Sequence, residues 1–230
     1  YSGGVDSHVL LHACSTLIKT RPTLSIEAVY IDHDLHEKSS QWRLHCEGVS
    51  KQLSIPFNSI KVDARDVNKE GPEQAARKAR YGAFKKLVKQ GVVLFTAQHQ
   101  DDQSETLMLQ LLRGCGVDGL AAMPKIDTFS NGHLVRPFLE LDKSSIMAYA
   151  DHHKLSWIED PSNIELDYNR NYLRHSVIPI IKERWPAFAK TTARTASHCA
   201  ESSHVLDKYL VQYIDAQEPR ILDIGSLLLR

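Results

Sequence analysis

The sequence lacks paired cysteines, long apolar stretches and an excess of charge of either sign. Its four cysteines, Cys14, Cys46, Cys115 and Cys199, are far apart and form no C-x-x-C pair, which argues against a zinc knuckle, an iron–sulfur site and a secreted disulfide framework. There is no signal peptide and no run of about 18 apolar residues, so we expect no membrane span and a cytoplasmic location. Basic and acidic residues number 28 each, so any binding of nucleic acid must depend on local patches.

Two common nucleotide-binding patterns are also missing. The chain has neither the G-x-x-x-x-G-K-[ST] pattern nor a G-x-G-x-x-G pattern placed between a strand and a helix. It has instead SGGVDS at residues 2–7, directly before an apolar helical pattern. Gly3 and Gly4 leave the backbone open to an anion, the helix start supplies unpaired N–H groups, and Ser2 and Ser7 add hydroxyls. The stretch, Val5 and Asp6 included, predicts a polyphosphate-binding loop; for an isolated S-G-G, a tight turn capped by serine is the plain alternative.

Asp6 indicates a metal ion at this loop. A carboxylate so close to a bound polyphosphate would repel it unless a divalent cation lay between the two, which favours Mg²⁺.

Strand and helix patterns alternate along the first half of the chain, which predicts a parallel, doubly wound α/β sheet. Helical patterns continue after residue 142, and R-W-P at 184–186 suggests a boundary between a catalytic domain, 1–184, and the beginning of a helical domain, 185–230. The expected strands are 24–31, 57–62 and 92–97, and the expected helices are 5–17, 39–53, 72–89, 101–113, 143–153, 169–184 and 187–215.

Both ends of the chain interrupt these patterns. An α/β fold would place a buried strand before the glycine loop, of which only Tyr1 is present, and the apolar pattern of 221–230 has no helix cap. We therefore expect a fragment that lacks its first strand and the rest of its helical domain.

A second group of polar residues follows the last expected strand, where open α/β sheets bind ligands. Asp102 and Glu105 are three residues apart and project from one face of a helix that we expect Asp101 or Asp102 to cap and Gly114 to end. The pair can hold Mg²⁺ or accept a proton; an acidic first turn that complements the helix dipole is the alternative. His99, just before the pair, and Arg113, at the end of the helix, favour a metal-binding or catalytic role for Asp102 and Glu105.

A third group, at 159–179, includes Arg170 and Arg174, which are one helical turn apart and can clamp a phosphate or carboxylate. An exposed charged helix face is the plain alternative.

These stretches carry a resemblance to a known family. SGGVDS resembles the pyrophosphate loop of the N-type ATP pyrophosphatases, the PP-loop proteins, and the whole set is similar to the tRNA(Ile)-lysidine synthetases. This sequence departs from the family pattern at residues 33–36, HDLH, where many members have a glycine and an arginine after the histidine. The matching stretches are IDH (31–33), EQAARKARY (73–81), HQDDQSETLMLQLLRGCGVDGLAAMP (99–124), RPFLEL (136–141), WIEDPSN (157–163) and NRNYLR (169–174).

The resemblance implies a fold like the adenine nucleotide alpha hydrolases and a two-step ligase reaction. ATP, with Mg²⁺, adenylates the wobble cytidine of an isoleucine tRNA whose anticodon is CAU, and free L-lysine then displaces AMP. The implied residues are Asp6, Asp102, Glu105 and Arg113 for catalysis; Ser2, Gly3, Gly4, Val5, Asp6, Ser7 and His33 for ATP; Asp6 and Asp102 for the metal; and Arg77, Arg80, Arg170, Asn171 and Arg174 for lysine or tRNA.

Three other functions fit parts of the pattern. A thiolase that adenylates a tRNA cytidine typically needs the C-x-x-C pairs that are absent here, and amidating synthetases share the loop but not NRNYLR. A non-catalytic adenine-nucleotide-binding module would not need Asp102, Glu105 and Arg113. The basic residues of 77–89 suggest a tRNA-facing helix, or a solvated charged face.

Overall fold

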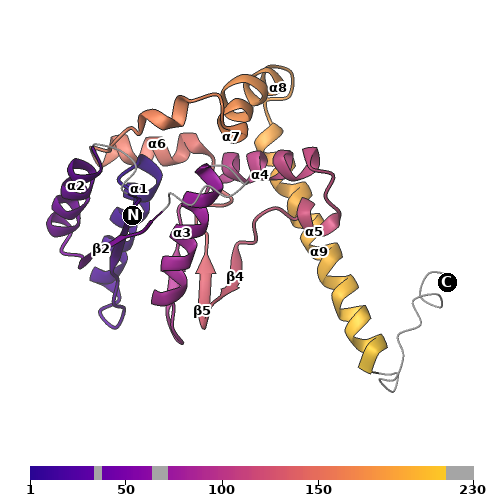
Figure 1. Cartoon of the computed structure of the whole chain (residues 1–230), viewed down its shortest axis with the longest axis horizontal. Helices are drawn as coiled ribbons and strands as arrows, with labels where there is room; N and C mark the ends of the chain where they lie inside the picture. Colours follow the sequence, from indigo (N-terminus) through magenta and orange to yellow (C-terminus); the bar gives the residue numbers. More distant parts are fainter. Residues whose placement is uncertain (34–37, 64–71, 216–230) are drawn as a thin grey trace.

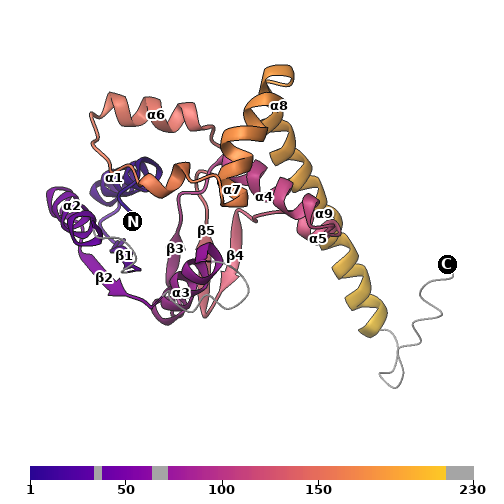
Figure 2. The same ribbon diagram turned by 45° about the horizontal axis from the view of Figure 1, so that its top comes forward.

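The computed structural model describes residues 1–33, 38–63 and 72–215. In these residues the strands lie in two groups (Figures 1 and 2). Strands β1 (Ala28–Asp32) and β2 (Phe57–Lys61) are parallel, with Ala28 opposite Phe57. In the other group β5 (Gly132–Val135) lies between β3 (Val93–Phe95), which is parallel to it, and β4 (Ile126–Phe129), which is antiparallel.

Helices precede and follow the strands, as the alternating pattern predicts. The helices are α1 (Val5–Thr20), α2 (Ser39–Gln52), α3 (Pro72–Leu87), α4 (Gln100–Leu112), α5 (Val117–Leu120), α6 (Lys143–His152), α7 (Asn169–Tyr172), α8 (Ile178–Arg184) and α9 (Phe188–Asp215). The parallel α/β architecture is therefore confirmed.

Helices cover both faces of the strands. Along β1, neighbouring side chains point to opposite faces: Ala28 packs with Leu11 of α1 and Val49 of α2, whereas Val29 packs against the cluster that contains Phe84 of α3. That second cluster also includes Leu94 of β3. This cluster therefore links α3 to one strand of each group.

The β4–β5 hairpin is not predicted by the sequence pattern. Its turn consists of Ser130 and Asn131, with Ser130 at φ 55°, and Ile126 at its outer end is 62% exposed. A strand so short and so exposed has no clear apolar alternation. The Gly132 backbone lies so close to the start of β3 that a Cβ would be 2.2 Å from the Val92 carbonyl oxygen.

The predicted helix 169–184 is one helical path with a change of pitch. A π-helical turn, Leu173–Val177, joins α7 to α8. Before it, a short 3₁₀ helix spans Pro161–Ile164. A π turn rotates the side chains that follow it relative to α7, and such turns are frequent at functional sites.

Helix α9 packs against α4 and α5 and then extends from the body of the molecule (Figure 1). Ser104 Oγ of α4 lies 2.7 Å from Thr192 Oγ1 of α9. The predicted boundary after Arg184 coincides with the end of α8, and the division into two domains stays a prediction. Among the described helices, none is long and apolar enough to cross a membrane.

Candidate active site

The glycine loop leads into α1 with a backbone that only glycine fits. Gly3 has φ +88°, and a Cβ at this position would lie 3.0 Å from both Cys46 Sγ and Ile158 Cδ1. The Gly3 carbonyl accepts a hydrogen bond of 2.9 Å from the Ile158 N–H. The loop is therefore held between α2 and the 156–158 segment, and Gly3 satisfies both the positive φ and the close approach.

The serine hydroxyls close the loop and leave the start of α1 open. Ser7 Oγ accepts from the Ser2 N–H at 3.2 Å and donates to the Gly4 carbonyl at 2.9 Å. Gly4 is the N-cap of α1, and among the described residues no side chain caps this helix. By contrast, His99 caps α4 and Asp142 caps α6. The uncapped N–H groups of α1 make its first turn suited to an anion.

The prediction that Asp101 or Asp102 caps α4 is wrong, because His99 occupies the N-cap. His99 Nδ1 accepts from the Asp101 N–H at 3.2 Å, and Asp102 Oδ2 accepts from the His99 N–H at 3.0 Å. This is a capping box with histidine in the place of serine or threonine. Since Nδ1 accepts, the other ring nitrogen, Nε2, faces the carboxylates: it lies 3.8 Å from Asp6 Oδ1 and 3.4 Å from Asp102 Oδ2.

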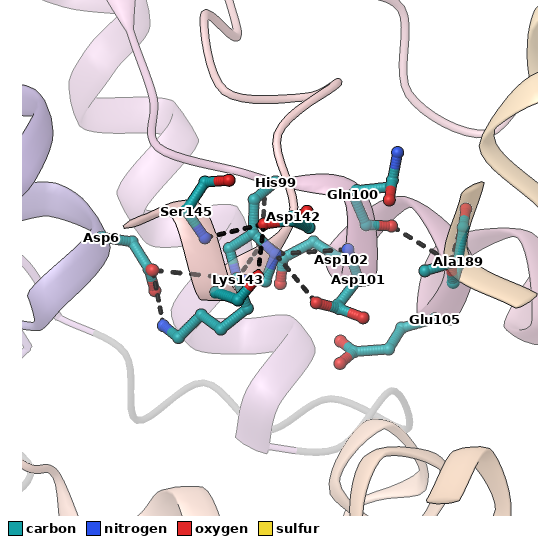
Figure 3. A network of polar contacts seen from close by, with 12 residues as sticks. Asp6, His99, Gln100, Asp101, Asp102, Glu105, Asp142, Lys143, Ser145 and Ala189 are labelled. Atoms are coloured by element: carbon teal, nitrogen blue, oxygen red, sulfur yellow. Dashed lines mark hydrogen bonds and ion pairs between the residues drawn. The ribbon is translucent and has the colours of Figure 1, made fainter. Parts of the chain in front are cut away.

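The side chains of Asp6, His99 and Asp102 converge with that of Lys143, which the sequence pattern did not single out (Figure 3). Lys143 Nζ lies 2.5 Å from Asp6 Oδ1, across 137 positions of sequence. A second lysine outside the predicted set, Lys182 of α8, lies 2.5 Å from Asp101 Oδ1. No spacing rule relates residues so far apart, so only the tertiary structure identifies these lysines.

Glu105 lies beneath this cluster, 1% exposed, with two arginines. Arg174 donates to both of its oxygens, Nε to Oε1 at 2.6 Å and Nη2 to Oε2 at 2.8 Å, and also to Asp102 Oδ1 at 3.2 Å. Arg170 Nε is 3.1 Å from Glu105 Oε2 as an ion pair without hydrogen-bond geometry, and its Nη2 donates to Thr106 Oγ1 at 2.8 Å. Burial lowers the pKa of Arg174, but the hydrogen bond and charge of Glu105, with Asp102 and Asp6, raise it overall.

Arg113 and Asn171 are among the predicted site residues that lie outside this cluster. Arg113 is exposed and is the C-cap of α4; at about 1.5 Å of rise per residue it lies about 16 Å along the helix axis from Asp102. Asn171 is buried, and its Nδ2 donates to the carbonyls of Ser162 and Glu165, both at 2.9 Å. Asn171 therefore fixes the loop before α7.

His33 follows the carboxyl end of β1 and faces α3. Its Nε2 lies 3.4 Å from Nε and Nη2 of Arg80; arginine only donates, so Nε2 accepts and Nδ1 carries the proton. The pKa of His33 is lowered to about 4, mainly by burial and to a smaller extent by the charge of Arg80. Nδ1 is buried and has no partner among the described residues, which fits a donor kept for a ligand. Arg77 stacks on Tyr81 at 4.7 Å; Asp34 and His36 lie outside the described residues.

The carboxylates at this site suit Mg²⁺ better than a metal held by protein ligands alone. Asp6 and Asp102 both approach His99 Nε2, but in the described ranges no group of three or more His, Cys, Asp or Glu side chains forms a metal site. Mg²⁺ is usually bound by one or two carboxylates together with substrate phosphates and water. The two residues therefore fit the ion that the sequence predicts.

Comparison with known proteins agrees with this geometry. Residues 1–181 match the family model ATP_bind_3, a PP-loop domain. Curated relatives include tRNA(Ile)-lysidine synthases from Coxiella burnetii, 44% identical over 208 residues (90% of this chain, 46% of the relative), and Serratia proteamaculans, 43% identical over 232 residues (99% and 52%). The chain thus spans about half the length of the curated relatives it matches.

A solved structure shares the fold. The U34-tRNA thiolase NcsA of Methanococcus maripaludis, with its [4Fe-4S] cluster, superposes with a TM-score of 0.70 at 13% identity, over 87% of this chain and 71% of that one. At this identity the likeness concerns the fold alone. The glycine loop at the start of α1, the parallel strands and the match over residues 1–181 agree, and the chain belongs to the PP-loop family.

Proposed function

We propose that the chain is the ATP-using catalytic part of a tRNA(Ile)-lysidine synthetase. The observation that carries this proposal is the convergence of an uncapped helix start beside Gly3 and Gly4 with the carboxylates of Asp6 and Asp102. The uncapped helix start is suited to bind a polyphosphate. The two carboxylates are suited to bind a metal ion and an amine. Identities of 41–44% to curated lysidine synthases support the same activity.

In the first step, the C2 oxygen of the wobble cytosine attacks the α-phosphorus of ATP. The bond to the β-phosphate bridging oxygen breaks, and pyrophosphate leaves. The first N–H groups of α1, together with Ser2 and Ser7, bind the leaving group and stabilise the charge that develops on it. Asp6 and Asp102 would hold Mg²⁺, which spreads the charge of the phosphates when bound. His33 Nδ1, a buried donor, is assigned to ATP.

In the second step, the ε-amine of lysine attacks C2 of the activated base, and the C2–O bond breaks to release AMP. The amine must lose a proton, which we assign to Asp102 and not to Glu105. The Asp102 side chain is 17% exposed, whereas that of Glu105 is 2% exposed and engaged by Arg174 and Arg170. Glu105 holds these arginines in place, and they in turn are suited to the lysine carboxylate or a tRNA phosphate.

Helix α3 supplies the surface that we assign to tRNA. The basic residues of this helix are exposed, and one of them, Arg80, contacts His33. The set is Arg77, Lys78, Arg80, Lys85 and Lys86, with Lys89 just beyond the helix. A base in an anticodon loop can be unstacked at a lower cost than a base in a duplex, so the target cytidine can enter such a site without the opening of a base pair.

A tRNA thiolase is the second candidate because NcsA shares the fold. That thiolase contains a [4Fe-4S] cluster, and such clusters are held by cysteine thiolates. Here Cys14 and Cys46 are buried, and the described residues hold no group of three potential metal ligands. The cysteine chemistry therefore favours the ligase.

Incorporation of radiolabelled lysine into isoleucine tRNA with a CAU anticodon tests the proposal directly. The full-length protein, with ATP and Mg²⁺, should label this tRNA and should leave methionine tRNA, which has the same unmodified anticodon, unlabelled. Omission of ATP is the control. ATP-dependent labelling by sulfide instead of lysine would assign the chain to the thiolases, and labelling by neither would overturn both functions.

A further inference from the structure

Lys143 is fixed at the active site by the backbone on both sides of it. It is the first residue of α6, whose N-cap Asp142 accepts a 2.7 Å hydrogen bond from the Ser145 N–H. The Gln100 N–H at the start of α4 donates to the Leu141 carbonyl at 2.9 Å. The starts of α4 and α6 are thereby joined, and the Lys143 side chain extends from this junction to Asp6 on α1 (Figure 3).

The contact between Lys143 and Asp6 is too exposed to matter much for stability. The two side chains are 38% and 31% exposed, and ion pairs so accessible to water contribute little to folding. A lysine held at a fixed helix start and directed into an open site therefore calls for a role other than folding.

The charge at the glycine loop indicates that role. Asp6 is in the first turn of α1, where the uncapped N–H groups favour an anion, but its own carboxylate opposes a polyphosphate. Lys143 neutralises that carboxylate from 2.5 Å. A phosphate on the first turn of α1 would come within reach of the ammonium group, which is a compact charge with three donors and suits phosphate oxygens.

From this geometry we infer that Lys143 is an ATP-binding residue that contacts the β- and γ-phosphates, the part of ATP that leaves as pyrophosphate. Its ammonium group moves from Asp6 to the phosphates when ATP binds, and this leaves the Asp6 carboxylate to face the metal. The assignment rests on the proposed use of ATP at this loop, and it adds a residue from α6 to an ATP site that otherwise includes the glycine loop and α1, the start of α4, and His33 after β1.

Titration calorimetry of the full chain with ATP and with AMP, both in Mg²⁺, tests the assignment without an activity assay. Lys143→Met should raise the Kd for ATP at least about tenfold and leave the Kd for AMP, which has no β- or γ-phosphate, unchanged. Lys143→Arg should restore most of the ATP affinity, because it keeps the charge. The matched control is Lys125→Met, which removes a lysine from the 2.8 Å pair with Glu140 outside the cluster and should change neither Kd.

Thermal unfolding of the unliganded variants identifies any effect on folding, and we expect the midpoint of Lys143→Met to stay within about 2 °C of the wild type. Equal losses of ATP and AMP affinity, or an unchanged ATP affinity, would overturn the role of Lys143 while the proposed function stands. A wild-type chain that binds neither nucleotide would overturn the assignment and the proposed function together.

Discussion

Glu105 and Arg174 form a bidentate ion pair at the base of the candidate active site, with Nε–Oε1 and Nη2–Oε2 distances of 2.6 and 2.8 Å. The pair joins α4 to the π-helical turn that follows α7. It positions the guanidinium of Arg174 so that its Nη2 also reaches Asp102. One buried carboxylate thus organises the cationic side of the site.

Replacement of Glu105 should therefore lower the stability of the fold. Glu105→Gln removes the charge and turns an amide N–H₂ towards the arginine donors, so we expect a loss of about 2 to 3 kcal/mol in the free energy of unfolding. This is less than for a fully buried pair, because Arg174 retains contact with water. Urea denaturation measures the loss. A variant as stable as the wild type would show that Glu105 does not hold the arginines.

Replacement of Asp102 should lower the rate of lysine transfer far more than it lowers the stability of the fold. Asp102→Asn keeps the shape and an acceptor for the His99 N–H, so we expect a stability loss of about 1 kcal/mol. Turnover should fall at least about a hundredfold, because the amide can neither accept the proton nor hold a metal ion as the carboxylate does. Single-turnover lysine transfer measures the rate. A stability loss with unchanged turnover would reduce Asp102 to a partner of the helix dipole.

Alanine at Gly3 should deform the loop, whereas alanine at Gly48 should not. Gly3→Ala introduces positive-φ strain of about 1 to 2 kcal/mol and a Cβ 3.0 Å from Cys46 Sγ, so both ATP affinity and the thermal midpoint should fall. Gly48 lies inside α2 with nothing within 4 Å of a Cβ. Gly48→Ala should raise stability by about 0.5 to 1 kcal/mol. If the two variants unfold alike, the Gly3 conformation is not a constraint.

Stability should decrease as the pH falls below about 6.5. Burial lowers the pKa of His8, against the effect of its 2.8 Å hydrogen bond to the Ser156 carbonyl, and burial also lowers the pKa values of His12 and His33. A histidine with a lower pKa when folded stabilises the protein above its unfolded pKa, and this contribution is lost as the pH falls towards the folded value. Unfolding free energies at pH 7.5 and 5.0 should therefore differ, and the difference should shrink in His8→Gln. An equal difference would exclude His8 from the pH response.

The basic side of α3 should govern the salt dependence of tRNA binding. Alanine at the exposed residues Lys85, Lys86 and Lys89 should weaken binding of all tRNAs alike and reduce the slope of log K against log salt by roughly two to three, because fewer counterions are released. ATP affinity should not change. A second triple variant, at Lys19, Lys51 and Lys125, removes the same charge elsewhere and should keep the wild-type slope. Identical slopes in both variants would exclude α3 from the interface.

The sequence by itself determined those features that are encoded within a few neighbouring residues. Apolar periodicity gave the order of α1, β1, α2, β2, α3 and β3, although the predicted strand 24–31 is shorter in the structure, Ala28–Asp32. The spacing of Asp102 and Glu105 gave two carboxylates on the first turns of α4, and SGGVDS gave the loop before α1. The local pattern did not predict every short-range feature. It missed β4, because that strand is short, and it missed the cap of α4, because a histidine, His99, occupies the N-cap.

Only the tertiary structure decided which charges meet. Lys143 contacts Asp6 across 137 positions and Arg174 contacts Glu105 across 69, and no local preference links residues so far apart. Their meeting depends on how α6 and the π-helical turn pack around the ends of the strands. The same packing buries Glu105 and leaves Asp102 partly exposed. Two carboxylates that look equivalent in the sequence therefore differ in their exposure to water and in their arginine partners, and this difference is the physical reason for the separate roles that we propose for them.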